Sequence, residues 1–185
     1  MPYASLRDFM DRLEREGRLK RVTAPVSPIL EMTEIQTRLL AEGGPAVLFE
    51  NVVGDGRRYD MPMLVNLFGT VERVAWGMDR EPKGLRAVGE TLAFLKQPEP
   101  PGGWREALEL FPLLKTVMTM KPKTVGSAPC QEVVLQGADI DLATLPIQTC
   151  WPGEPAPLIT WPLVVTKGPG KRKEDDYNLG IYRMQ

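Results

Sequence analysis

The segment NLGIYR, residues 178–183, carries the side chains best suited to binding and chemistry. Alternate residues of a strand face opposite sides, so Asn178, Gly180 and Tyr182 share one side and Arg183 lies on the other. The Asn178 amide oxygen suits a hard divalent cation, and the Arg183 guanidinium suits a carboxylate or phosphate. A glycine in mid-strand indicates a close approach to the backbone. An outward-facing edge strand with an ordinary arginine is the alternative that these residues leave open.

Two other segments are candidates for binding loops. Residues 149–158, TCWPGEPAPL, hold Trp151 in a proline-dense loop that either covers a sheet edge or forms one wall of a ligand site. Residues 167–177, KGPGKRKEDDY, lack the spacing of a phosphate-binding loop and the helix that must follow it. Their net charge is small, so we expect a solvated hairpin loop there.

The composition excludes several kinds of chemistry. The sequence has no histidine, which removes Ser-His-Asp and Cys-His nucleophiles and His-ligated zinc from what the chain does alone. With 23 Lys and Arg against 24 Asp and Glu, the net charge is −1 and favours no nucleic-acid partner. Cys130 and Cys150 match no zinc or redox motif, and two reduced thiols are favoured over a disulfide. No stretch resembles a signal peptide or a membrane span, so a cytoplasmic location is expected.

The elements that must position these residues fall into two groups. In the first, Ser5 followed by Asp8 predicts a capped helix that ends at Gly17, before a β-like piece at 19–22. A second helix is predicted with Ile35, Leu39 and Leu40 as its buried stripe, and residues 43–45, Gly-Gly-Pro, end it.

Further elements of this first group follow along the chain. Short apolar runs predict strands buried on both faces at 46–50 and 63–68, with a polar turn over 54–60 between them. Thr70 is expected to cap a short helix that runs through Trp76. Later helices are expected at 84–96 and, kinked at Pro112, at 104–118, separated by a Pro- and Gly-rich connector at 97–103.

Beyond residue 121 the pattern becomes β-rich. Strands are predicted at 130–135, 158–166 and 179–184, separated by proline-rich turns. We therefore expect an α+β chain, with an α/β domain over 1–121 and an incomplete β domain over 122–185. Three strands are too few for a barrel or sandwich, and the last one would expose unpaired backbone groups. This favours a fragment of a longer protein over a chain completed by a partner.

Several long segments resemble the UbiD family of prenylated-flavin-dependent decarboxylases. They include GGPAVLFENV, MPMLVNLFGT, LPIQTCWPGEPAPLITWPLVV and NLGIYR, and the likeness runs nearly from end to end of the chain. The resemblance implies an N-terminal α/β domain followed by the beginning of a split β-barrel like that of flavin reductases. It also implies removal of CO₂ from 3-polyprenyl-4-hydroxybenzoate, in ubiquinone biosynthesis, or from a related aromatic or unsaturated acid.

The resemblance also assigns roles to residues of this sequence. Asn178 matches the asparagine that helps to ligate Mn²⁺ at the cofactor phosphate. Ile181, Tyr182 and Arg183 match the segment that lines the prenylated FMN site, with Arg183 near the reacting carboxylate as the catalytic arginine. Thr160 matches a threonine that contacts the cofactor, although the loop between it and Asn178 is about three residues longer here than in relatives.

What the resemblance implies for the whole protein goes beyond these residues. Family members are well over twice as long, and their second metal carboxylate and acidic proton donor lie beyond the segments matched here. We therefore expect the isolated chain to be inactive. The family likeness implies a homo-oligomer, and a polyprenyl substrate would bring it peripherally to the inner membrane face. The alternative is a folded self-association module without catalysis, and a third reading, less favoured, is a stand-alone cofactor carrier.

Overall fold

The structure is a computed structural model that describes residues 3–97, 125–169 and 177–185, together with 103, 104, 108, 111–113, 115 and 117. The chain divides into two compact units. The first contains Met1–Leu85, Asp141–Thr166 and Asn178–Gln185, and the second contains Arg86–Ile140 and Lys167–Tyr177. All the site residues named above belong to the first unit.

The first helix, α1 (Leu6–Arg15), begins at the predicted capping box. The Ser5 hydroxyl accepts a hydrogen bond from the Asp8 N–H, and the Asp8 carboxylate accepts one from the Ser5 N–H. Together these bonds satisfy two backbone donors that a helix start leaves without intrahelical partners. Gly17 ends the turn beyond the helix in the left-handed conformation, at φ 69°.

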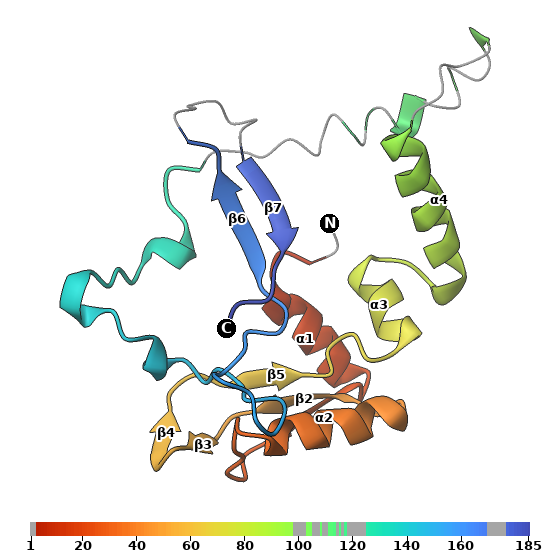
Figure 1. The fold of residues 1–185 in the computed structure, drawn as a ribbon. Helices are drawn as coiled ribbons and strands as arrows, with labels where there is room; N and C mark the ends of the chain where they lie inside the picture. The colour runs from red at the N-terminus through yellow and green to blue at the C-terminus, as the bar shows by residue number, and fades with distance from the viewer. Residues whose placement is uncertain are drawn as a thin grey trace. The chain divides into compact units, whose positions relative to one another are not determined.

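A three-stranded sheet forms the centre of the first unit (Figure 1). Its strands are β1 (Leu19–Val22), β2 (Ala46–Phe49) and β5 (Met63–Val65), in the order β1-β2-β5. β2 pairs parallel with β1 and antiparallel with β5. The prediction of strands at these places is confirmed, although β5 stops at Val65, short of the predicted 68.

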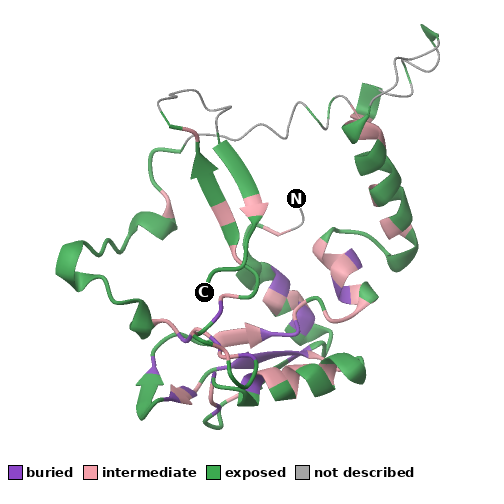
Figure 2. Ribbon diagram, in the orientation of Figure 1, coloured by how far each residue is buried: buried purple, intermediate pink, exposed green. Residues whose placement is uncertain are grey.

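Strand β2 is buried on both faces because a helix covers each one. Val47 and Phe49 pack on one face against Met32 of α2 (Glu31–Ala41). Ala46 and Leu48, on the other face, pack against Phe9 and Leu13 of α1. Burying a large apolar side chain contributes about 2 kcal/mol, more than the exposed ion pairs of the surface can give. These two apolar layers therefore stabilise the unit, and Figure 2 shows the buried residues gathered there.

The buried stripe of α2 differs from the prediction at one end. Met32 is fully buried and Ile35 and Leu39 are partly buried, whereas Leu40 is 54% exposed. Residues 32, 35 and 39 follow the helical repeat, and Leu40 lies about 100° around the helix from Leu39. The prediction that Leu40 belongs to the core was wrong for this reason.

A β-hairpin replaces the polar turn predicted over 54–60. β3 (Val52–Gly54) pairs antiparallel with β4 (Arg57–Tyr59), and Tyr59 is buried. Asp55 and Gly56 form the two-residue loop, with φ of 52° and 74°. Positive φ at both central positions matches the twist of a tight hairpin.

Helix α3 (Val71–Gly77) is capped as predicted, by the Thr70 hydroxyl, which accepts from the Arg73 N–H. A 3-10 turn at Pro82–Gly84 (η1) leads into α4 (Leu85–Lys96). The predicted helix over 104–118 lies largely outside the described residues, and the predicted domain boundary near 122 lies wholly outside them.

The strand predicted at 130–135 was wrong. Pro129–Gln131 (η2) is a short 3-10 helix, and two more follow at Gly137–Asp139 (η3) and Leu142–Thr144 (η4). Val133 and Val134 are 77% and 66% exposed. β propensity depends on a neighbouring strand and a half-buried face, and this segment has neither in the described part of the chain.

The end of the chain forms a two-stranded sheet of β6 (Leu163–Lys167) and β7 (Tyr177–Ile181), which run in opposite directions (Figure 1). Isolated bridges join Gln148 to Leu158 and Ile159 to Met184, outside these strands. The mixed α+β class is confirmed, whereas the split barrel stays a prediction. Among the described residues, no helix has the length and apolar character needed to cross a bilayer.

Candidate functional site

The structure brings Thr160 and Arg183 to the same short β bridge. Ile159 and Met184 exchange backbone hydrogen bonds of 2.8 and 3.3 Å. Thr160 directly follows Ile159, and Arg183 directly precedes Met184. In an antiparallel pair such neighbours lie opposite each other and share the face that the bridged residues do not use. Two predicted site residues that are 23 positions apart in the sequence therefore flank the same backbone bridge.

The other predicted site residues follow along the same strand. Asn178 and Ile181 belong to β7, Tyr182 follows it, and all three are exposed. Arg183 is five positions after Asn178 and lies two residues beyond the end of β7, so an extended backbone would span about 17 Å between them. A small ion at Asn178 therefore cannot also contact Arg183, and a ligand that uses both residues must be elongated.

The predicted close approach to Gly180 is made by a neighbouring ring. A side chain at position 180 would overlap the Tyr182 ring, which lies two residues along on the same side of the strand. Tyr182 thus occupies the space that the missing side chain leaves. The absence of a side chain at Gly180 therefore leaves room for the Tyr182 ring.

Thr160 also lines a recess of about 470 Å³ in the first unit. We call it the Gln148 recess. Its wall combines the loop after β5 with segments near Gln148 and Thr160, and its principal lining residues are Asn66, Phe68, Gly69, Gln148, Thr160 and Trp161. None of the described residues that line it is ionisable. A neighbouring recess of about 380 Å³ shares Gln148, Thr160 and Trp161 as its wall.

The backbone around Gln148 is held on both sides. The Gln148 carbonyl accepts from the Leu158 N–H at 2.7 Å. Its neighbour Thr149 donates to the Pro28 carbonyl at 3.2 Å and accepts from the Leu30 N–H at 2.9 Å. These bonds tie the proline-rich loop to the start of α2, and the Glu154 carboxylate closes that loop on the Cys150 N–H at 2.6 Å. The Gln148 side chain therefore projects from a fixed segment.

The opposite wall of the recess is built around Asn66. This residue is 6% exposed and has φ of 55°, a conformation that asparagine tolerates better than most residues. Its amide donates to the Gly44 and Pro45 carbonyls at 3.1 and 2.9 Å. A side chain at position 69 would overlap that of Asn66, so the recess needs glycine there.

Arg73 supports this wall from behind. It is 1% exposed and donates to the carbonyls of Leu67, Gly44 and Asn66, each at 2.9 Å. Burial lowers the pKa of Arg73, but guanidinium remains charged in proteins. The buried cation thus holds the loop after β5 to the turn before β2.

Sequence reasoning missed Gln148 and Asn66 as candidate binding residues. Gln148 is 8% exposed, and its amide nitrogen Nε2 is buried with no hydrogen-bond partner among the described residues. The signal available was one amide side chain inside each largely apolar segment, LPIQTC and MLVNLF. That signal indicates a buried polar group but not which cavity it lines.

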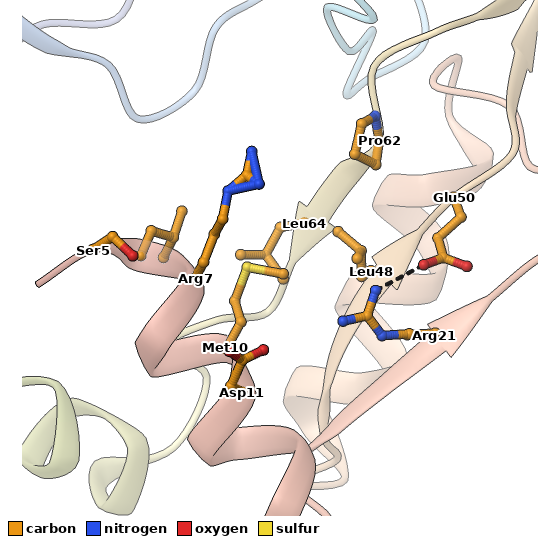
Figure 3. Close-up of a pocket in the computed structure, with 10 residues that line it drawn as sticks. Ser5, Arg7, Met10, Asp11, Arg21, Leu48, Glu50, Pro62 and Leu64 are labelled. Atoms are coloured by element: carbon orange, nitrogen blue, oxygen red, sulfur yellow. Dashed lines mark hydrogen bonds and ion pairs between the residues drawn. The ribbon is translucent and has the colours of Figure 1, made fainter. Parts of the chain in front are cut away.

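A larger recess of about 730 Å³ lies between α1 and the sheet, and none of the predicted site residues lines it (Figure 3). Arg21 at its edge pairs with Glu50 and Glu14, each at 2.8 Å. The hydrogen bond from Arg21 lowers the pKa of Glu14, and the two carboxylates raise the pKa of Arg21. The guanidinium already has two acidic partners and is a poor anchor for an anionic ligand.

The cysteines and the acidic residues form no reactive cluster in the described part of the chain. Cys130 is exposed, Cys150 is buried, and both are free thiols, as predicted. Burial raises the pKa of Cys150, so its nucleophilic thiolate is disfavoured. Among the described residues, no three His, Cys, Asp or Glu side chains gather where they could hold a metal ion.

Two family models match the sequence, in chain order. Residues 10–92 match the 3-octaprenyl-4-hydroxybenzoate carboxy-lyase N-terminal domain of UbiD. Residues 123–185 match the Rift-related domain of the same carboxy-lyase. The second match contains Thr160 and the whole segment from Asn178 to Arg183.

Solved structures of UbiD-class enzymes have the same fold over almost the whole chain. HmfF from Pelotomaculum thermopropionicum, an evolved dimeric form in complex with prFMN, is 27% identical with a TM-score of 0.68. The vanillic acid decarboxylase of Sedimentibacter hydroxybenzoicus in open form is 27% identical with a TM-score of 0.70. Each match covers 99% of this chain but 36% of the other. A 3,4-dihydroxybenzoic acid decarboxylase from Enterobacter cloacae, 24% identical over 99% of this chain and 35% of its own, with a TM-score of 0.69, shares the fold.

Proposed function

Because this chain belongs to the UbiD family, we propose that it supplies part of the cofactor and substrate site of a decarboxylase that uses prenylated FMN. Two models of that family together match most of the chain, and one matched structure holds prFMN. The chain spans about a third of the length of the matched enzymes. The activity of the whole protein is therefore our proposal.

The single observation that supports the proposal is the bridge between Ile159 and Met184, because Thr160 and Arg183 are the residues directly next to it. Arg183 would bind the substrate carboxylate through its fixed guanidinium fork. Thr160, Ile181 and Tyr182 would line the flavin. When bound, the prenylated flavin would serve as the electron sink for the electron pair left when CO₂ departs.

Asn178 would contribute one amide oxygen to a Mn²⁺ ion at the cofactor phosphate. Its distance from Arg183 along the strand, about 17 Å, suits an elongated cofactor whose phosphate and reacting ring lie at opposite ends. These residues would supply part of a site for the cofactor and the substrate. They offer a neutral oxygen for the cation, a hydroxyl and a ring for the flavin, and a guanidinium for the carboxylate.

We propose 3-polyprenyl-4-hydroxybenzoate or a related aromatic or unsaturated acid as the substrate, and we expect the isolated chain to be inactive. The carbon that loses CO₂ must receive a proton from an acid positioned beside it. Arg183 cannot serve, because guanidinium does not release its proton in proteins. One neutral ligand at Asn178 also holds Mn²⁺ weakly.

An assay of CO₂ release tests this proposal in two parts. The purified chain, mixed with prenylated FMN, Mn²⁺ and 4-hydroxybenzoate, should release no CO₂ above background. A chimera in which this chain replaces the matching third of the vanillic acid decarboxylase should release CO₂ from an aromatic acid. In that chimera Arg183→Met should abolish release while flavin absorbance shows that the cofactor still binds. Full activity of the Arg183→Met chimera would contradict the assigned role.

A second candidate function is supported by the surface of the β6–β7 sheet. Leu163, Val165, Leu179 and Ile181 are 69%, 64%, 66% and 56% exposed. Monomeric proteins rarely expose so many neighbouring apolar side chains on one small sheet. This observation favours a module that associates with a second copy, with or without catalysis.

A further inference from the structure

We propose that the Gln148 recess binds a neutral aromatic ring that bears an oxygen acceptor, and that the Gln148 amide donates the hydrogen bond to that oxygen. The recess adjoins the proposed site because Thr160 lines it and directly follows Ile159, which bridges to Met184 next to Arg183. The identity of the ring as one end of an aromatic acid rests on the proposed function. The existence of the binding site does not.

The charge of the recess limits what it accepts. Its described lining residues carry no ionisable group, and its polar side-chain atoms come from three amides, the Thr160 hydroxyl and the Trp161 indole N–H. A carboxylate or phosphate placed there would lose its hydration without gaining a cation, which is strongly unfavourable. The ligand group that fits is therefore uncharged.

The aromatic side chains of the recess indicate a flat ligand. Phe68 and Trp161 meet edge to face, with ring centroids 5.5 Å apart. Both rings keep a substantial exposed surface, 37% for Phe68 and 58% for Trp161. Rings packed in this way present apolar faces and edges on which another aromatic ring can pack.

Gln148 supplies the specific contact. Buried polar groups in folded proteins nearly always have hydrogen-bond partners, and the Nε2 group of Gln148 has none in the described part of the chain. The last torsion of a glutamine side chain is soft, so the amide can turn toward the recess without leaving its place. A hydroxyl or carbonyl oxygen on the ligand would then satisfy its N–H.

These contacts point to a substrate class within the proposed function. With its carboxylate at Arg183, an aromatic acid would extend past Thr160 into an uncharged recess that favours a hydroxyl-bearing ring. Hydroxylated aryl acids should then be preferred over plain ones. Phenol, a neutral ring with one oxygen, is the simplest probe of the recess by itself.

An NMR titration of the isotopically labelled 185-residue chain tests the site without flavin, metal or turnover. The Gln148 side-chain amide signals are identified as those missing from a Gln148→Leu variant. Phenol should shift them in the wild-type chain, and Gln148→Leu should weaken phenol binding about fivefold, the effect of one neutral hydrogen bond. Toluene, which lacks the oxygen, should bind both proteins equally. The matched control Gln131→Leu changes an exposed glutamine and should bind phenol as the wild type does.

Thermal unfolding of the same variants separates binding from folding. Because Gln148→Leu removes an unsatisfied buried amide and keeps a similar volume, its Tm should equal or exceed that of the wild type. A residue that serves only the fold would lower Tm when replaced. Unshifted amide signals with phenol, unchanged phenol affinity in Gln148→Leu, or a lower Tm would each overturn the proposal. None of these results bears on CO₂ release by the chimera.

Discussion

Arg73 is a positively charged residue in the interior of the first unit. It is fully buried, yet it meets three backbone carbonyls rather than a carboxylate. Carbonyl dipoles offset part of the cost of removing the charge from water, and the three bonds fix two chain segments in return. Its role is to position the wall of the Gln148 recess.

We expect Arg73→Met to lower the free energy of unfolding by about 2–4 kcal/mol, because it leaves buried carbonyls without their donor. The matched control is Arg38→Met. Arg38 is exposed and pairs with Glu34 one helical turn away, so its loss should change stability by less than about 0.5 kcal/mol. Urea denaturation of both variants measures the difference. Equal effects would show that Arg73 does not support the wall.

At this scale the sequence singles out Arg183 and Thr160 as candidates, whose roles stay predictions, and it does not single out Gln148. A guanidinium or a hydroxyl is recognised by its chemistry and by the family motif around it. Whether an amide is satisfied depends on the groups that surround it in space, and those groups come from distant segments.

Among the elements, the β3–β4 hairpin depends on a turn with two positive φ angles. Gly56 has φ of 74° and open space around its Cα, so its requirement is conformational and not steric. Gly89, in the middle of α4, also has open space but lies in an ordinary helix. Replacing each glycine with alanine therefore compares two backbone conformations without a difference in steric crowding.

Gly56→Ala should destabilise the chain by about 1–2 kcal/mol, the cost of forcing a side chain into the left-handed region. Gly89→Ala should instead stabilise α4 by about 0.5–1 kcal/mol, because alanine is the better helix former. Circular dichroism during thermal unfolding reports both changes. The same sign for both substitutions would contradict the assigned conformations.

Helices were predicted from sequence more reliably than strands were. The capping residues Ser5 and Thr70 act within one turn of their helices, so local sequence specifies those starts. A strand needs a partner, and segment 130–135 has strand-like composition without one in the described part of the chain. The β3–β4 hairpin differs from the prediction because the polar residues 54–60 indicated a seven-residue turn. In the structure only Asp55 and Gly56 form the turn, and the residues on either side pair as strands.

For the molecule as a whole, the exposed apolar sheet of β6 and β7 predicts association. The double variant Leu179→Lys with Ile181→Lys should reduce concentration-dependent association measured by light scattering, because charges oppose burial of that face. The control Leu92→Lys alters an equally exposed leucine on α4 and should leave association unchanged. A wild-type chain that stays monomeric at high concentration would contradict the prediction.

The sequence by itself determined the family, the α+β class and the two-sided burial of β2. These follow from local composition, periodicity and motif, which need no knowledge of distant contacts. The tertiary structure alone decided that Thr160 and Arg183 flank one bridge, that Asn66 and Gln148 line one recess, and that Arg73 is buried behind it. Each of these depends on segments brought together by packing and backbone hydrogen bonds, and no local pattern encodes which segments meet.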